Sequence, residues 1–303
     1  MKSRVSFWNF FWVVIGLVVV FHIAGGWYFS SELIQDGFVP EPEPITPAQG
    51  SYELAEVTYR TPLGEMDAWY LPADGPIWVI HIHGLGDTPA EAEPLFAPLQ
   101  DAGYPQLSIT YRNDDGQPID PSGYYQYGAT EWEDVAGAVD YAVANGAQSV
   151  VLSGFSTGSA HAMSFLSRQP QEIVSGVLLD APNVDFGRTV DYAASQRDLP
   201  VLPLPVPATV SATAKFITSL RIGINWKVLD YISDADETIR QPVLIHHGTE
   251  DLTVPLDVSL DLEATNPDLI HLITVEGAGH IESYDVDHQG YVDSAVAFLA
   301  ELG

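Results

Sequence analysis

The 303-residue sequence contains no cysteine, so disulfide bonds, thiolate metal sites and cysteine nucleophiles are all excluded. Positive charge is also scarce, because 11 Lys and Arg residues stand against 41 Asp and Glu, which gives a formal net charge of −30. A field of this sign favours solubility and repels nucleic acid and anionic membrane surfaces. We therefore expect no nucleic-acid partner, and a strongly anionic substrate is disfavoured.

Charged residues are absent between positions 5 and 31, where Phe, Trp, Val, Ile and Leu dominate. The run 7–29 is long enough for a helix to cross a bilayer. Lys2 and Arg4 precede this run, so the positive-inside rule leaves the tip, residues 1–6, in the cytoplasm. We expect a single-pass anchor in the cell membrane with the rest of the chain outside.

A cleaved signal peptide, which would leave a secreted protein, is the alternative to an anchor. The best candidate cleavage site, Ala-Gly-Gly at residues 24–26, fits the small-x-small pattern poorly and is followed by three aromatic residues. Residues 30–50 follow the apolar run and include Pro-Glu-Pro-Glu-Pro at 40–44. Alternating proline and charge predicts an extended, solvated tether.

Apolar, strand-like runs alternate with helical segments over residues 51–182 and again over 241–303. This alternation predicts one α/β domain built on a doubly wound, mostly parallel sheet. The expected strands are 54–60, 66–71, 77–82, 106–111, 149–152, 173–179, 242–246 and 269–275. The expected helices are 90–102, one from about 131, one after residue 156, 256–264 and 287–301. Thr-Glu-Trp-Glu at 130–133 predicts a capping box.

The alternation stops over residues 183–240, which are too many for an ordinary connection. We interpret this stretch as a helical cap, inserted between two strands and lying over their carboxyl ends, with helices near 209–222 and 226–232. The cap contains a proline-rich apolar run at 199–207. That run either packs the cap onto the core, which we favour, or lines an acyl pocket.

The pentapeptide Gly-Phe-Ser-Thr-Gly at 154–158 stands between a predicted strand and a predicted helix. G-x-S-x-G in this context is typical of a nucleophile elbow, whose sharp turn leaves no space for side chains at the two glycines. Ser156 is therefore the candidate nucleophile. An aspartate nucleophile at the elbow is disfavoured, because position 156 is a serine.

A serine needs a base to take its proton and a third group to orient that base. His280 lies in a glycine-rich loop after the last strand, and Asp251 lies in the loop after the strand before it. We predict that His280 is the base and Asp251 the orienting acid. Asp180, at the end of the strand after the elbow, and Glu250 are the alternative acids.

Seven other histidines lie in the body of the chain: His81, His83, His161, His246, His247, His271 and His288. We interpret them as structural, with His83 ordering the loop that follows its strand. The carboxylates at 114–115 and 131–134 are interpreted as turn and helix-start residues, so no metal site is expected.

Together these motifs resemble the α/β-hydrolase superfamily, and the segments 61–64 and 68–72 look like its capped esterase, lipase and serine-peptidase-like branches. His-Ile-His-Gly-Leu-Gly-Asp at 81–87 is similar to the loop that supplies half of the oxyanion hole. The resemblance implies that the backbone N–H groups of Leu85 and Thr157 bind the oxyanion.

The resemblance also implies hydrolysis of a carboxylic ester through an acyl-enzyme, with no cofactor. We expect a small-molecule ester or acyl substrate whose acyl group is uncharged or hydrophobic. An acyltransferase, a peptidase or a perhydrolase on the same triad, and a non-catalytic ligand-binding protein, are the alternatives. The substrate-binding residues and the oligomeric state are not predicted.

Overall fold

The computed structural model describes residues 7–36, 52–169, 172–200 and 202–303. Its main sheet has eight strands in the order β1-β2-β4-β3-β5-β6-β9-β10. The strands are β1 (Ala55–Thr61), β2 (Gly64–Leu71), β3 (Ile77–Ile82), β4 (Gln106–Ile109), β5 (Ser149–Phe155), β6 (Val174–Asp180), β9 (Val243–Gly248) and β10 (Ile270–Val275). Only β2 runs antiparallel to its neighbours, so the predicted mostly parallel, doubly wound α/β sheet is confirmed.

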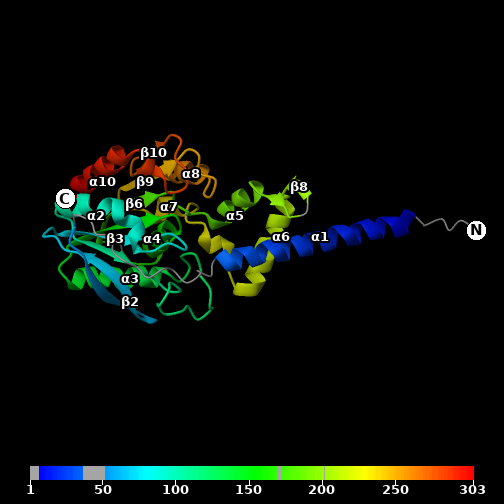
Figure 1. Ribbon diagram of the computed structural model, residues 1–303, viewed down its shortest axis with the longest axis horizontal. Helices are drawn as coiled ribbons and strands as arrows, with labels where there is room; N and C mark the ends of the chain where they lie inside the picture. The colour runs from blue at the N-terminus through cyan, green and yellow to red at the C-terminus, as the bar shows by residue number, and fades with distance from the viewer. Residues whose placement is uncertain (1–6, 37–51, 170–171, 201) are drawn as a thin grey trace, which may run out of the picture.

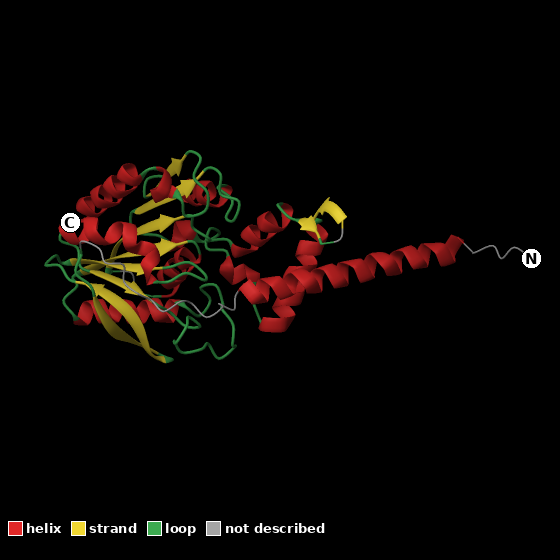
Figure 2. Ribbon diagram, in the orientation of Figure 1, coloured by secondary structure: helices red, strands yellow, loops and turns green. Residues whose placement is uncertain are grey.

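The central strands are apolar because helices cover both faces of the sheet (Figure 2). Successive residues point to opposite faces: Ile80 and Leu152 belong to one hydrophobic cluster, Val79 and Val151 to the other. The first cluster includes residues of α3 (Trp132–Ala144), α4 (Thr157–Arg168) and α8 (Asp257–Thr265). The second includes residues of α2 (Glu93–Asp101) and α10 (His288–Leu302).

Two details of the predicted helices are wrong. The segment expected as one helix at 90–102 divides into a 3₁₀ turn, η1 (Pro89–Ala92), and α2. The capping box at 130–133 does not form, because no side chain caps the first turn of α3. Glu133 instead accepts a hydrogen bond from Arg112, which a sequence pattern of local spacing does not reveal.

The insertion between β6 and β9 contains α5 (Phe186–Ser195), a hairpin of β7 (Asp198–Leu199) and β8 (Leu202–Pro205), α6 (Ala208–Ile222), η2 (Trp226–Leu229) and α7 (Ala235–Thr238). A short helix, α9 (Ser283–Val286), lies between β10 and α10. The helix expected near 209–222 is α6, whereas α5 was not expected. The proline-rich run forms the hairpin at the outer end of the insertion (Figure 1), where Leu204 is 55 % exposed. Its expected packing onto the core is therefore wrong.

One long helix, α1 (Phe7–Asp36), projects away from the sheet (Figure 1). Its segment Trp8–Ile34 is long and apolar enough to cross a membrane or to act as a signal. The helix does not end at residue 29, so residues 30–36, expected in the tether, are helical instead. The expected tip at 1–6 and the remaining tether at 37–50 lie outside the described residues.

The base of α1 packs against α6 of the cap. A Cβ atom on Gly26 would lie 2.6 Å from Thr213 Cγ2, and one on Gly25 would lie 3.1 Å from Val210 Cγ1. Small residues allow two helices to approach closely. The Gly25-Gly26 pair, considered above as part of a weak cleavage site, is therefore a helix-packing contact.

Arg112 connects β4 to the start of α3 in a buried ionic network. Its Nε lies 2.7 Å from Asp134 Oδ2, and its Nη1 lies 3.1 Å from Asp120 Oδ2. Nη2 lies 2.8 Å from Glu133 Oε2. Asp134 and Asp120 are both buried, so neither carboxylate has water to replace the guanidinium.

We expect Arg112→Met to lower the free energy of unfolding by about 3–5 kcal/mol, because it leaves buried carboxylates without a counter-charge. Arg60→Met is the matched control: Arg60 is exposed and pairs with Glu65 at 3.7 Å, so about 1 kcal/mol or less is expected. Urea unfolding of both variants in detergent measures the difference. Equal losses would contradict a structural role for the network.

Candidate active site

Ser156 occupies the sharp turn between β5 and α4. Its backbone has φ 46° and ψ −114°, a strained conformation that costs a residue with a side chain about 1–3 kcal/mol. Close packing enforces the turn, since a Cβ on Gly154 would lie 2.6 Å from Ser159 Cα. A Cβ on Gly158 would overlap the carbonyl oxygen of Ile82. Both glycines are therefore required.

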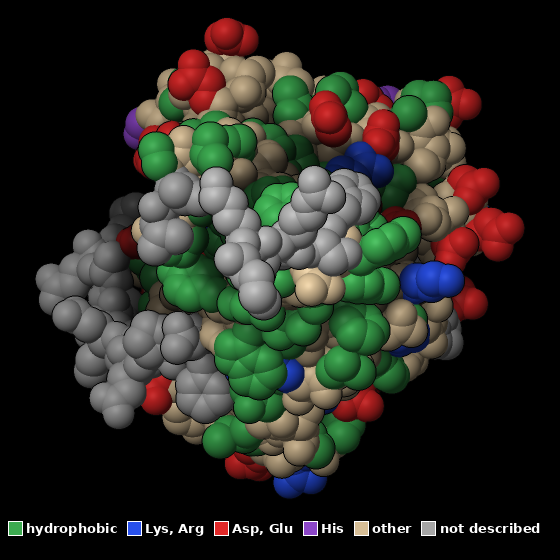
Figure 3. Space-filling view, turned by 90° about the vertical axis from the view of Figure 1, so that its right-hand side faces the viewer, with side chains coloured by type: hydrophobic (Ala, Val, Ile, Leu, Met, Phe, Trp, Pro, Cys, Tyr) green, Lys and Arg blue, Asp and Glu red, His purple; other side chains and the backbone are tan. Residues whose placement is uncertain are grey.

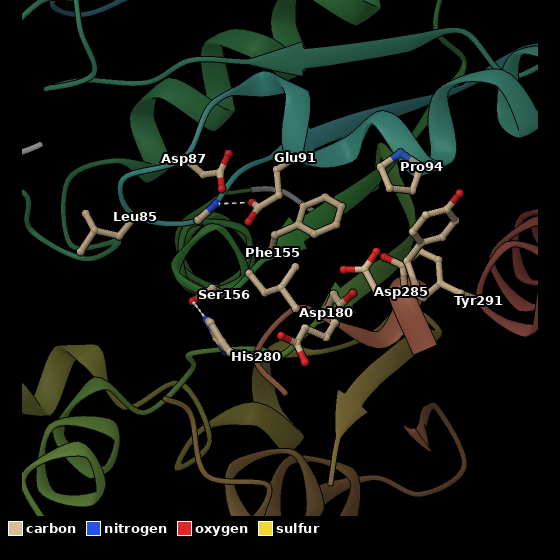
Figure 4. Close-up of a pocket in the computed structure, with 14 residues that line it drawn as sticks. Leu85, Asp87, Glu91, Pro94, Phe155, Ser156, Asp180, His280, Asp285 and Tyr291 are labelled. Carbon is tan, nitrogen blue, oxygen red and sulfur yellow. Dashed lines mark hydrogen bonds between the residues drawn. The ribbon is translucent and has the colours of Figure 1, made fainter. Parts of the chain in front are cut away.

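The structure brings the three predicted triad residues together. Ser156 Oγ lies 2.9 Å from His280 Nε2 (Figure 4). His280 Nδ1 lies 2.7 Å from Asp251 Oδ2. The distances are those of a serine that donates to an imidazole and an imidazole that donates to a carboxylate. His280 follows β10 and Asp251 follows β9, so the carboxyl ends of neighbouring parallel strands place them beside the elbow.

Asp251 is held by more donors than His280 alone. Its Oδ1 accepts hydrogen bonds from the amides of Thr253, at 2.7 Å, and Val254, at 2.9 Å. His247 Nε2 lies 3.3 Å from Oδ2. Burial raises the pKa of Asp251, but the hydrogen bonds from His247 and His280 outweigh it and hold this pKa well below its usual range. Asp251 is therefore ionised near neutral pH.

Neither alternative acid is bonded to His280. Glu250 is exposed, and Asp180 Oδ1 accepts a hydrogen bond from Ser283 Oγ at 3.2 Å. Burial raises the pKa of Asp180 to about 6, and hydrogen bonds from Tyr291 and Ser283 only partly offset that rise. The geometry thus favours Asp251.

The loop after β3 is held rigidly beside Ser156. His83 Nδ1 donates to the carbonyl of Gly84 at 2.8 Å, and its Nε2 lies 3.0 Å from Asp114 Oδ2. Burial lowers the pKa of His83, but the charge and hydrogen bond of Asp114 outweigh it and raise this pKa to about 8. A protonated His83 can donate from both nitrogens, so it contacts and orders this loop as predicted.

Glu91 was not anticipated from the sequence. Its Oε2 accepts a hydrogen bond from the amide of Gly84 at 2.6 Å (Figure 4). Burial raises the pKa of Glu91 to about 8, and the nearby Asp87 adds to the rise. Glu91 therefore links η1 to the loop after β3. Gly84 lies seven residues before Glu91 in the chain, and no local sequence pattern indicated this contact.

The predicted oxyanion donors lie beside Ser156. Leu85 and Ser156 together line the pockets on both sides of the elbow, and Thr157 lines one of them. Thr157 is the first residue of α4, so its amide has no acceptor within the helix. In the described part of the chain the Leu85 amide has no backbone acceptor either. Both donors are available to a ligand.

Two cavities meet at Ser156, and their walls differ in chemistry. One, of about 460 Å³, is lined by carboxylates and aromatic rings, including Glu91, Asp180 and Asp285 (Figure 4). The other, of about 320 Å³, is mainly apolar. Both volumes fall within the range of about 300–1,000 Å³ that is usual for ligand sites.

The remaining histidines lie away from the nucleophile or in structural positions. His81 Nε2 bonds Gln106 Oε1, and His246 Nε2 bonds Ser294 Oγ. His161 is fully buried against the Tyr111 ring, and burial lowers its pKa to about 3. His247 is hydrogen-bonded as expected, but its position next to Asp251 was not foreseen. Within the described ranges, no group of three His, Asp or Glu residues is arranged to hold a metal ion.

Solved structures with the same architecture identify the fold. An esterase from Pyrococcus furiosus superposes with a TM-score of 0.65 over 88 % of this chain and all of its own, at 19 % identity. The chain has the α/β-hydrolase fold. An acylaminoacyl peptidase from Pyrococcus horikoshii has a TM-score of 0.62 against this chain at 15 % identity, over 84 % of this chain and 42 % of its own.

A bromoperoxidase from Bacillus anthracis shares the α/β-hydrolase fold as well, with a TM-score of 0.55 and 17 % identity over 81 % of this chain and all of its own. No protein-family model matches the sequence, and no curated protein matches it. The similar structures therefore establish the fold, and the chemistry must be argued from the site.

The raised pKa of Glu91 predicts a pH-dependent stability. Its folded-state pKa of about 8 lies above the ordinary value of 4.5, so the wild type loses stability as the pH rises from about 5 to 9. Glu91→Gln keeps an acceptor for Gly84 but does not ionise. We expect its melting temperature, relative to wild type, to rise by about 10 °C over that interval.

Thermal unfolding of the full chain in detergent measures this difference. Glu65→Gln, at an exposed carboxylate, is the control and should follow the wild type at every pH. A constant difference between Glu91→Gln and wild type would show that Glu91 has no raised pKa.

Proposed function

We propose that this protein is a serine hydrolase that cleaves carboxylic esters through an acyl-enzyme. The observation that carries the proposal is the continuous hydrogen-bonded chain from Ser156 through His280 to Asp251, placed on a strained elbow. Serine is activated by this arrangement because a base lies within hydrogen-bond distance of its hydroxyl. The esterases among the similar structures agree with the proposal.

Ser156 Oγ attacks the ester carbonyl carbon while its proton passes to His280 Nε2. Asp251 keeps the His280 Nδ1–H in place and stabilises the imidazolium that forms. When the tetrahedral intermediate collapses, the carbon–oxygen bond breaks, and His280 returns the proton to the leaving alcohol. Water then attacks the acyl-enzyme with His280 as base, which releases the carboxylic acid and restores Ser156.

The amides of Leu85 and Thr157 are proposed to bind the oxyanion. In comparable enzymes, removing one such donor raises the activation free energy by about 3–4 kcal/mol. The bonds that hold the neighbouring Gly84, to His83 and Glu91, explain how the Leu85 amide stays in position without reorganising. Preorganised donors stabilise a developing charge better than water does, because they need not rotate during the reaction.

The two cavities support an ester with an uncharged acyl group. The apolar cavity fits a hydrocarbon chain, and the exposed carboxylates of the other cavity, Asp87 and Asp285, would repel an anionic leaving group. We also propose that α1 anchors the enzyme in the cell membrane, with the N-terminus in the cytoplasm and the hydrolase domain outside. The length and composition of α1 and the position of Lys2 and Arg4 support this orientation.

Fluorophosphonate treatment of the full chain in detergent should place the adduct on Ser156, as mapped by mass spectrometry. Ser156→Ala should not be labelled, and its kcat/KM for p-nitrophenyl butyrate should fall by at least about 10⁴-fold. Ser153→Ala, at a buried serine of β5, is the control that should label normally. A folded wild type that neither labels nor cleaves the ester would refute the hydrolase proposal.

Asp251→Asn should lower kcat by about 10³–10⁴-fold, because an amide does not stabilise the imidazolium or select its tautomer. Asp180→Asn should have a much smaller effect, since Asp180 bonds Ser283 rather than His280. Steady-state kinetics with p-nitrophenyl butyrate compare the two variants. A larger loss in Asp180→Asn would assign the role of the triad acid to Asp180.

A further inference from the structure

The apolar cavity beside Ser156 has the membrane helix itself as one wall. Its lining includes Phe29, Glu32 and Leu33 of α1, together with cap residues such as Val190 and Ala194. No described residue of the proline-rich run lines it, which corrects the other expectation for that run. The helix that we propose as an anchor is therefore also part of the substrate site.

Several polar contacts fix α1 in this position. His22 Nε2 lies 2.8 Å from Thr209 Oγ1, and Thr218 Oγ1 donates to Ser30 Oγ at 2.9 Å. The Tyr127 hydroxyl of the core donates to the carbonyl of Leu33 at 3.2 Å. Contacts therefore reach both the cap and the core, and they hold the pocket wall in register with the nucleophile.

The depth of the pocket relative to a bilayer follows from the length of the apolar segment. Its 27 residues rise about 40 Å as a helix, whereas the hydrocarbon core is about 30 Å thick. The final turns of this segment, with Phe29 and Leu33, therefore lie at the membrane boundary. Arg221 lies over the Trp27 ring at 4.6 Å, and Arg197 pairs with Glu32 at 3.1 Å, as suits that boundary.

The cap presents further apolar side chains on the same side of the molecule. Phe216 and Leu220, one turn apart on α6, are 64 % and 71 % exposed. Hydrophobic side chains gather in the centre of the face from which α1 projects, while Asp and Glu residues lie mostly toward its margins (Figure 3). Exposed apolar surface marks a site of protein or membrane interaction, and the long apolar helix that projects from the same face favours a membrane.

We propose that the apolar cavity binds the acyl chain of a membrane lipid ester, which enters from the bilayer along α1. This inference rests on the proposed hydrolase function and adds the substrate class. The pocket wall begins where the bilayer ends, so an acyl chain reaches Ser156 without crossing water. α1 then acts as a chain guide as well as an anchor.

The pocket is tested with two esters of one fluorogenic alcohol, 4-methylumbelliferyl oleate and 4-methylumbelliferyl butyrate. The full chain is reconstituted in phosphatidylcholine vesicles that contain the ester. Ala194→Trp fills the cavity, so kcat/KM for oleate should fall about tenfold or more, while that for butyrate stays within about threefold. Ser195→Trp, at the next, exposed position of α5, is the matched control and should cleave both esters normally.

A second pair of variants tests the α1 wall. Phe29→Ala removes a ring that lines the cavity, and we expect a loss of about five- to tenfold on oleate with little change on butyrate. Ile23→Ala, on the exposed side of α1, should behave as wild type. Because Phe29→Ala shortens a side chain instead of enlarging one, it decides the question if Ala194→Trp does not fold.

Delivery through the bilayer is tested by placing the oleate ester in the enzyme's own vesicles or in a separate vesicle population. The wild type should be at least about tenfold faster in the first case, since transfer through water is then unnecessary. Equal rates, or unchanged oleate hydrolysis in both pocket variants, would overturn this inference and leave the hydrolase proposal intact. A wild type that cleaves neither ester would instead overturn the hydrolase proposal itself.

Discussion

The strained turn at Ser156 is the constraint on which the rest of the structure depends. A serine with φ 46° persists only where surrounding backbone leaves no alternative, and the carbonyl of Ile82 and the backbone at Ser159 provide that restraint. The central parallel strands and the two glycines exist in this arrangement to hold one hydroxyl out of the sheet.

The carboxylates around the turn fall into two groups, whose pKa values are shifted in opposite directions. Asp251 receives donors from two amides and two histidines, so its pKa is low and it stays ionised. Glu91 and Asp180 have fewer donors, and burial raises the pKa of both. The protein has a net charge of −30, yet carboxyl groups near the nucleophile resist ionisation. Local solvation, and not the total charge, sets the pKa of each group.

The cap and α1 make the surroundings of Ser156 chemically different on its two sides. Cap helix α6 packs on α1 through Gly25 and Gly26, and both helices contribute residues to the wall of the apolar cavity. The polar cavity lies on the other side of Ser156. A single nucleophile therefore stands between an apolar space bounded by a long apolar helix and an acidic space, which agrees with the lipid ester proposed above.

Local patterns in the sequence determined the sheet, its order of strands and helices, the elbow and the three triad candidates, because strand periodicity and glycine-rich turns are short-range signals. Local sequence patterns did not predict the contacts between residues far apart in the chain. The capping box failed because Glu133 instead bonds Arg112, which lies in the turn after β4. Glu91 was missed because its partner belongs to a loop that it meets only after folding. The sequence favoured Asp251 over Asp180 as the triad acid, but the place of His247 and the α1 wall of the cavity were decided by tertiary structure alone. These depend on which atoms lie within a few ångströms in space, and spacing along the chain carries no such information.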